Sequence, residues 1–153
     1  MNRIEKVREY IDNIIIHMQN TEERRCAYVH LYGVSQACAM IAVKRNDNVE
    51  LATIAGMLHD IYSYATMDRI DHAHNSAAMA RNILIKTDIF CENEIDTVCS
   101  AIYHHSEKHI THSAFDEIIK DADVLQHCLY NPLFDVAEHE KVRFEGLKKE
   151  FCL

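Results

Sequence analysis

Histidine and aspartate residues recur in this chain at positions where a metal ion would need them. The adjacent pair His59-Asp60 ends one amphipathic segment, and His72 begins the next. His30 and His105 lie in the apolar stripes of two other segments. Imidazole nitrogen and carboxylate oxygen are the ligand types that suit Mn, Fe, Ni, Co and Zn. These residue types raise the hypothesis of a metal site, although a His-Asp pair by itself is weak evidence.

The helical period indicates which of these residues point to the interior. His30 lies four residues after Cys26 and four before Val34, in the middle of an apolar stripe. Asp123 lies four residues after Ile119, near the inward face of its segment. Any one of these polar groups could be satisfied by a hydrogen bond inside a core. Two carboxylates and several imidazoles buried together need a shared compensation, which a divalent cation would supply.

Successive residues on a helix point about 100° apart, and this separates two pairs of near neighbours. His104 lies off the stripe that carries His105, and His74 lies off the stripe that His72 begins. We therefore expect His105 and His72 to be ligands, and His104 and His74 not to be.

The same period leaves other choices open. Asp121 and Asp123 flank the stripe of their segment on either side, so the period does not decide between them. At a fraying helix end the angular restriction relaxes, so His59 and Asp60 can hold one ion, or Asp60 can bridge two. The remaining histidines are expected on the surface or in loops: His17, His109, His112, His127 and His139.

The elements that must position these residues are helices. The chain has only three glycines and one proline, which leaves little turn chemistry for a many-stranded fold. Apolar periods predict helices over about 4–18, 20–44, 47–59, 72–84, 91–105, 115–125 and 131–147, with a loop over 61–71. Asn20 and Asp47 are expected to cap the second and third helices, and Phe134 is expected to point inward from the last.

The length of 153 residues and the absence of linkers or repeats fit a single domain. We predict an all-α fold, a single bundle of about six or seven helices over residues 1–153. Its motif-bearing core spans about 20–130, and the C-terminal helix packs on that core.

Composition and charge exclude several classes of protein. The net charge of -8 argues against binding of nucleic acid through its phosphates. The charged N-terminal stretch MNRIEKVREYIDN does not resemble a signal peptide, and no apolar run is expected to approach the roughly 20 residues of a membrane span. We therefore expect a cytoplasmic protein without a membrane partner. None of the six cysteines forms a Cys-x-x-Cys pair, which argues against a zinc ribbon or a thioredoxin-type site, and several lie among apolar residues, so we expect reduced cysteines in the core.

The order of these residues resembles a known family. His30, then Leu58-His59-Asp60, then Asp121-Ala122-Asp123 is similar to the H…HD…D pattern of the HD-domain metal-dependent phosphohydrolases, over about residues 20–130. The stretches HAHNSAAMARNIL and AIYHHSEK are similar to segments that carry extra histidines in the two-metal branch.

The resemblance implies a particular set of ligands. His30, His59, Asp60 and Asp123 would hold a first ion, and His72 and His105 would add a second that Asp60 bridges. The resemblance favours Asp123 over Asp121. Two divalent ions of Fe, Mn, Ni, Co, Zn or Mg are expected, about 3.5–4 Å apart.

The implied activity is hydrolysis of a phosphomonoester, phosphodiester or phosphoanhydride of a small molecule, such as a nucleotide, by metal-bound hydroxide. Asp60, His105 and Lys108 are the expected catalytic residues. Lys108 would clamp a phosphate, unless it is an ordinary solvated lysine. In a one-metal site, His72 and His105 would instead contact the phosphate or donate a proton.

Features specific to two branches are missing. HDIYSY lacks the acidic residues that follow the His-Asp pair in the guanosine-polyphosphate hydrolase branch. No Gly-Tyr-Pro motif follows the histidines, as it would in the cyclic-dinucleotide branch. Tyr62 and Tyr64 could line a pocket or only pack. A di-iron oxygenase and a non-catalytic module that binds a nucleotide or a protein are the alternative hypotheses, and a homo-oligomer is compatible with the sequence.

Overall fold

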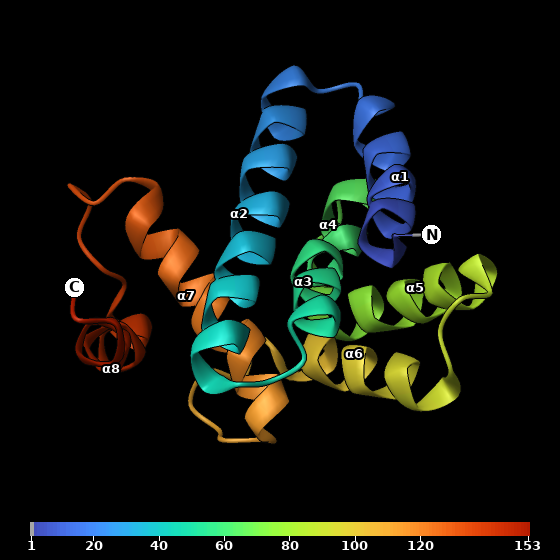
Figure 1. The fold of residues 1–153 in the computed structure, drawn as a ribbon. Helices are drawn as coiled ribbons and strands as arrows, with labels where there is room; N and C mark the ends of the chain where they lie inside the picture. The colour runs from blue at the N-terminus through green and yellow to red at the C-terminus, as the bar shows by residue number, and fades with distance from the viewer. Residues whose placement is uncertain (1) are drawn as a thin grey trace.

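The computed structural model describes residues 2–153, and this part of the chain is helical and contains no strand (Figure 1). The elements in chain order are α1 (Arg3–Ile16), α2 (Thr21–Arg45), α3 (Val49–Leu58), α4 (Ile61–Thr66), α5 (His72–Thr87), α6 (Glu92–His104), α7 (Ala114–Tyr130), the 3₁₀ turn η1 (Glu138–Glu140) and α8 (Lys141–Phe151). The predicted all-α fold is confirmed.

Helix α3 lies at the centre of the fold. Every residue from Leu51 to Leu58 is buried, which is typical of a helix that is apolar on all sides. Helices α1, α2, α6 and α7 all pack against α3 (Figure 1). Because α3 ends at Leu58, the histidine that follows it is held at a fixed point of the interior.

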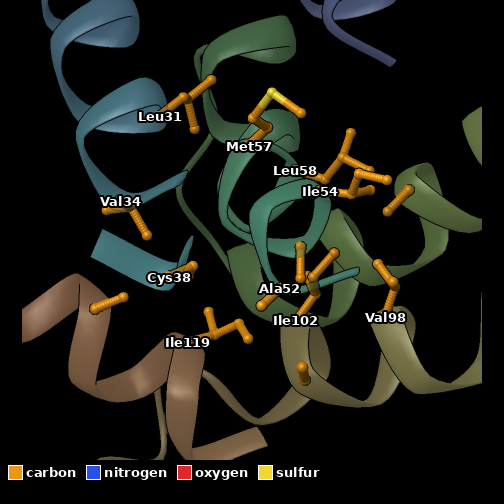
Figure 2. Packing of buried hydrophobic residues seen from close by; sticks show 14 of the residues in the cluster. Leu31, Val34, Cys38, Ala52, Ile54, Met57, Leu58, Val98, Ile102 and Ile119 are labelled. Carbon is orange, nitrogen blue, oxygen red and sulfur yellow. The ribbon is translucent and has the colours of Figure 1, made fainter. Parts of the chain in front are cut away.

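The core joins helices that are distant in the sequence. Figure 2 shows Leu31 and Val34 of α2, Met57 of α3 and Ile119 of α7 turned toward one interior, and all four are fully buried. Burial of such a side chain contributes about 1.5–3 kcal/mol each. One apolar cluster takes residues from α1 to α8, and Leu147 is the buried residue that α8 contributes.

Gly56 allows α2 and α3 to approach closely. A Cβ atom at this position would lie 2.8 Å from Ser35 Cα and 2.9 Å from Cys38 Sγ. Both atoms belong to α2, so only glycine fits at this crossing without a shift. The crossing lies one turn before His59.

The structure corrects several local expectations. Asn20 caps α2 as predicted, but Asn48 rather than Asp47 caps α3, by accepting from Leu51 N–H. Asn and Asp cap equally well, so sequence alone does not choose between neighbours. Ile61–Thr66 forms α4 inside the predicted loop, because six residues are too few to show a period.

The C-terminal segment also differs from its prediction. The last helix was expected from about residue 131, but α8 begins at Lys141. The residues between are turns and the short η1, and Phe134 is 70% exposed rather than inward. An Asn side chain competes with helix formation here, since Asn131 Oδ1 accepts from Leu133 N–H.

Helix α2 is long and apolar enough to cross a membrane by length and composition alone. This finding corrects the expectation that no apolar run approaches that length. In the structure, however, α2 packs along α3 and α7 as a core helix, and core helices pass the same test. The composition of α2 is therefore weak evidence for a membrane span.

Candidate metal centre

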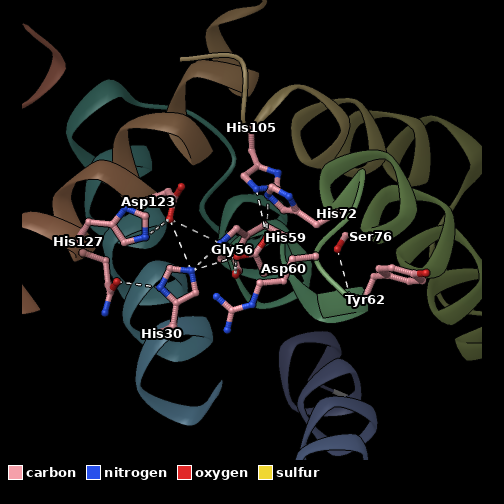
Figure 3. Close-up of polar contacts among 12 residues, drawn as sticks. His30, Gly56, His59, Asp60, Tyr62, His72, Ser76, His105, Asp123 and His127 are labelled. Carbon is pink, nitrogen blue, oxygen red and sulfur yellow. Dashed lines mark hydrogen bonds and ion pairs between the residues drawn. The ribbon is translucent and has the colours of Figure 1, made fainter. Parts of the chain in front are cut away.

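The six residues predicted as ligands meet at one place, although four different helices and one helix junction supply them (Figure 3). Each comes from a helix or from a residue at a helix end. They are His30 in α2, His59 and Asp60 between α3 and α4, His72 at the start of α5, His105 at the end of α6 and Asp123 in α7. We call these six residues the metal cluster.

Four of them form a first group of donor atoms. His30 Nε2 lies 3.3 Å from Asp60 Oδ2 and 3.6 Å from Asp123 Oδ1. His59 Nε2 lies 3.5 Å from the same Asp60 oxygen and 3.7 Å from the same Asp123 oxygen. Two nitrogens and two oxygens thus surround one point.

The other oxygen of Asp60 faces a second group. Asp60 Oδ1 lies 3.3 Å from His105 Nε2 and 3.5 Å from His72 Nε2. The donor atoms of these three residues lie within 4.8 Å of one another. The Asp60 carboxylate therefore stands between two groups of histidines, one at each oxygen.

Hydrogen bonds on the far side of three rings set their tautomers. His59 Nδ1 donates to Gly56 O at 2.8 Å, and His105 Nδ1 donates to Ile102 O at 2.7 Å. His30 Nδ1 donates to Gln126 Oε1 at 2.8 Å. Because the proton is on Nδ1 in each neutral ring, the lone pair of Nε2 points into the cluster, as in histidines that bind metals.

These tautomers leave lone pairs facing one another. His30 Nε2 and His59 Nε2 are 3.1 Å apart, so two neutral rings of this tautomer would set their lone pairs against each other. Against the effect of burial, the charges of Asp60 and Asp123 raise the pKa of His59, so the carboxylates draw positive charge to this point. Asp60 Oδ1 and Asp123 Oδ1 are buried and have no hydrogen-bond partner. Such groups are costly to bury without a positive charge between them. The donor set therefore fits divalent cations.

The electrostatics of the cluster also favour positive charge. Burial alone would raise the pKa of Asp60, but His59, His105 and His30 hold it well below its usual value. Burial opposes ionisation of Asp123 too, yet Lys108 and His59 hold the pKa of Asp123 well below its usual value. Both carboxylates are thus ionised. Burial lowers the pKa of His105, which keeps that ring neutral.

Lys108 lies against the cluster rather than at an open mouth. Its ammonium donates to Asp123 Oδ2 and, at 2.8 Å, to His105 O. The Lys108 side chain is only 10% exposed. Lysine therefore occupies one oxygen of Asp123 and leaves the other, Oδ1, facing the histidines.

The close alternatives lie elsewhere. Asp121 is bound by Arg45 at 2.7 Å and by Arg143 at 2.9 Å, away from the metal cluster. His104 Nδ1 lies 3.2 Å from Asp116 Oδ2. His74 pairs with Asp71 on the surface. The structure places Asp123 and His105 in the cluster, and places none of these alternatives there.

His104, Glu107 and His112 form another group with donor atoms close together. His112 Nδ1, however, accepts from the ammonium of the fully buried Lys120. The His112 proton is then on Nε2, which faces Glu107 Oε2 at 3.4 Å. This group is satisfied without an ion.

The sequence interpretation missed two residues beside the metal cluster. His127 was expected on the surface or in a loop, but its Nε2 lies 3.3 Å from Asp123 Oδ1. Gln126 holds His30 through the bond described above. The signal for His127 was its position four residues after Asp123, on the same face of α7.

A pocket of about 340 Å³ opens onto His30 and Asp60. Its lining includes Arg25, Arg69 and Tyr64. Burial and the charge of Asp60 raise the pKa of Tyr64, so this ring lines the pocket as a neutral phenol. Tyr62 is not part of this lining, and its hydroxyl donates to Asp68.

An all-helical fold that directs buried histidines and aspartates at one point defines a metal-binding helical domain. The HD domain family matches residues 27–127, which include the whole metal cluster. The chain therefore belongs to the HD domain family, whose members are mostly metal-dependent phosphohydrolases and bind divalent metals. Neither the curated proteins nor the solved structures gave a match.

Proposed function

We propose that this protein is a metal-dependent phosphohydrolase that acts on a small phosphorylated molecule. The observation that carries the proposal is the Asp60 carboxylate, which offers one oxygen to each of two histidine groups. His30, His59 and Asp123 would complete the first ion site. His72 and His105 would complete the second.

Divalent ions bound there would offset the charges of Asp60 and Asp123, neutralise a phosphate and lower the pKa of a water molecule. The protein contributes orientation. Hydrogen bonds to Gly56 O and Ile102 O fix His59 and His105, and Lys108 holds one oxygen of Asp123. Because α3 is buried on all sides, its C-terminal end is held in place, and this end positions His59 and Asp60.

The pocket supports an anionic substrate of nucleotide size. A volume of about 340 Å³ falls within the range of small-molecule sites. Arg25 and Arg69 line it in a chain whose net charge is -8; each pairs with an exposed or half-exposed glutamate, Glu22 and Glu23, which a phosphate could replace. Tyr64 offers a flat surface on which a base could stack. We infer a phosphorylated small molecule such as a nucleotide, in the cytoplasm, with neither nucleic acid nor a membrane as partner.

A panel of substrates and metals tests the proposal. Metal is first removed from the protein with a chelator. The metal-free protein is then supplied with Mn²⁺, Fe²⁺, Ni²⁺, Co²⁺, Zn²⁺ or Mg²⁺, and phosphate release from nucleotides and simple phosphate esters is measured. We expect release with at least one metal and none from Asp60→Asn. Iron-dependent oxygen uptake without phosphate release would instead identify an oxygenase. Nucleotide binding without turnover would identify a binding module.

The number of ions can be tested separately. We expect His72→Ala and His105→Ala each to reduce the bound metal from two ions per chain toward one, measured by elemental analysis. His74→Ala is the matched control, because His74 lies on the same helix but pairs with Asp71. If His72→Ala and His105→Ala keep the wild-type metal content and lose turnover, the site holds one ion and these histidines act on the substrate.

A further inference from the structure

We propose that His127 is a further ligand of the first ion, and that Glu140 positions it. This inference rests on the proposed metal site and extends it by one protein ligand. Glu140 lies outside residues 27–127, the part of the chain that matches the family. The additional ligand is thus held by the C-terminal segment of this particular chain.

Helix α7 brings His127 to the first group of donor atoms. His127 follows Asp123 by one helical turn, and its Nε2 lies 3.3 Å from Asp123 Oδ1. The His127 ring stacks on that of His30, with centroids 5.2 Å apart and planes 12° apart. Figure 3 shows the rings of His127 and His30 next to each other, both beside Asp123. His30, Asp123 and His127 together can place one donor atom each within 4.8 Å.

Glu140 fixes the direction of the His127 ring. His127 Nδ1 lies 2.8 Å from Glu140 Oε1, and an ionised carboxylate can only accept a hydrogen bond. The Glu140 side chain is 6% exposed, whereas that of His127 is 45% exposed. A carboxylate buried to this degree needs a partner. The bond to Glu140 places the proton of a neutral His127 on Nδ1.

The other ring nitrogen then repeats the pattern of the metal cluster. His127 Nε2 presents a lone pair to Asp123 Oδ1, and that oxygen is buried without any donor. Two acceptor atoms at this distance require a positive charge between or beside them. The ion that Asp123 Oδ1 shares with His30 and His59 would supply it.

A competing arrangement makes the opposite prediction. If His127 were an imidazolium, it would pair with Glu140 on one side and Asp123 on the other, and would compete with the metal for Asp123. Removing His127 would then leave the affinity for metal unchanged or increase it. If His127 is a ligand, removing it must weaken binding. The sign of the change separates the two.

The experiment measures metal binding and needs no substrate. Zn²⁺ is titrated into metal-free wild-type, His127→Ala and Glu140→Gln proteins in competition with a chelator of known affinity. Circular dichroism checks the fold of each protein. We expect His127→Ala to weaken binding of the first ion at least tenfold. Glu140→Gln should weaken it less, because the oxygen of glutamine can still accept from His127 Nδ1 and orient the ring. The control is His139→Ala, an exposed histidine next to Glu140 that should change nothing.

The titration distinguishes a failure of this inference from a failure of the proposed function. Unchanged or tighter Zn²⁺ binding in His127→Ala, with wild-type protein that binds, would overturn this inference and leave the proposed function standing. Wild-type protein that binds no Zn²⁺, Mn²⁺ or Co²⁺ would overturn both. With Co²⁺ as the probe, His127→Ala should also alter the ligand-field absorption of the first ion, and an identical spectrum would count against ligation.

Discussion

Two carboxylates of α7, only two residues apart in the chain, are almost equally buried and have opposite surroundings. Asp121 is 7% exposed and Asp123 is 5% exposed. Each oxygen of Asp121 is paired with an arginine, Oδ2 with Arg45 and Oδ1 with Arg143. Asp123 pairs one oxygen with Lys108 and leaves Oδ1 without a donor.

The groups around these carboxylates differ in the same way. We call Arg45, Glu117, Asp121, Arg143 and Glu150 the arginine cluster. Arg45 bridges Asp121 and Glu150, and Arg143 bridges Asp121 and Glu117. Lys120 also pairs with Glu117, so the three acidic groups are compensated by three positive charges of the protein itself. The metal cluster contains more hydrogen-bond acceptors than donors and needs a positive charge that the protein itself does not supply. A cluster whose charges are neutralised within the protein indicates a structural role. A cluster that lacks compensating positive charge indicates a binding site.

The largest effect is expected from breaking the metal cluster. His59→Ala or Asp60→Ala should remove bound metal, because either substitution deletes a donor from the centre. The melting temperature of the metal-treated variant should fall to that of chelated protein. An ion present at 1,000 times its Kd stabilises by about 4 kcal/mol, and this contribution would be lost. Calorimetry and elemental analysis measure both, and full metal content in either variant would contradict the assignment.

A smaller effect should distinguish the two carboxylates directly. Asp121→Asn should lower stability by about 2 kcal/mol with and without metal, because it leaves two partly buried arginines with one fewer charge to pair with. Its metal content should not change. Asp123→Asn should lose metal. The free energy of unfolding should then differ less between metal-treated and metal-free protein than it does in the wild type. If Asp121→Asn loses more metal than Asp123→Asn, the two roles are reversed.

The helix crossing that supports the metal cluster can be tested with a matched pair of glycines. Gly56→Ala should destabilise the protein by about 1–3 kcal/mol, because its Cβ meets Ser35 and Cys38 of α2. It should also weaken metal binding, since Gly56 O holds His59. Gly146→Ala is the control: its Cβ meets nothing within 4 Å in α8, and it should stabilise by about 0.5–1 kcal/mol.

The smallest expected effect is the pH response of the arginine cluster. Burial opposes ionisation of Glu117, but bonds from Lys120, His112 N–H and Arg143 lower its pKa from 4.5 to about 2. A lowered pKa means that the stabilisation is complete above pH 4.5 and is lost as the pH falls toward 2.

Glu117→Gln should therefore be less stable than wild type at pH 6, by about 1–2 kcal/mol after allowance for solvent screening. The difference should shrink toward pH 2 when chelated proteins are unfolded by urea. Glu145→Gln is the control, since Glu145 is largely exposed on α8. A difference that stays constant from pH 6 to pH 2 would contradict the shift.

The sequence by itself determined the helices and the residues that face inward. A period of three to four residues is local, so it predicted the seven longer helices and placed His30 and Asp123 on buried faces. It also separated His105 from His104, since neighbours on a helix point in different directions. The order of His30, His59-Asp60 and Asp123 indicated the family that the match over residues 27–127 shows.

Only the tertiary structure decided which charges meet. The period could not separate Asp121 from Asp123, because the decision rests on Arg45, which lies 76 residues away in the chain, and on Arg143. His127 gained its position from Glu140, across a segment whose turns have no period to predict them. Pairing between distant residues depends on how helices pack. The sequence therefore predicted candidate ligands, and the fold determined which of them have no partner within the protein.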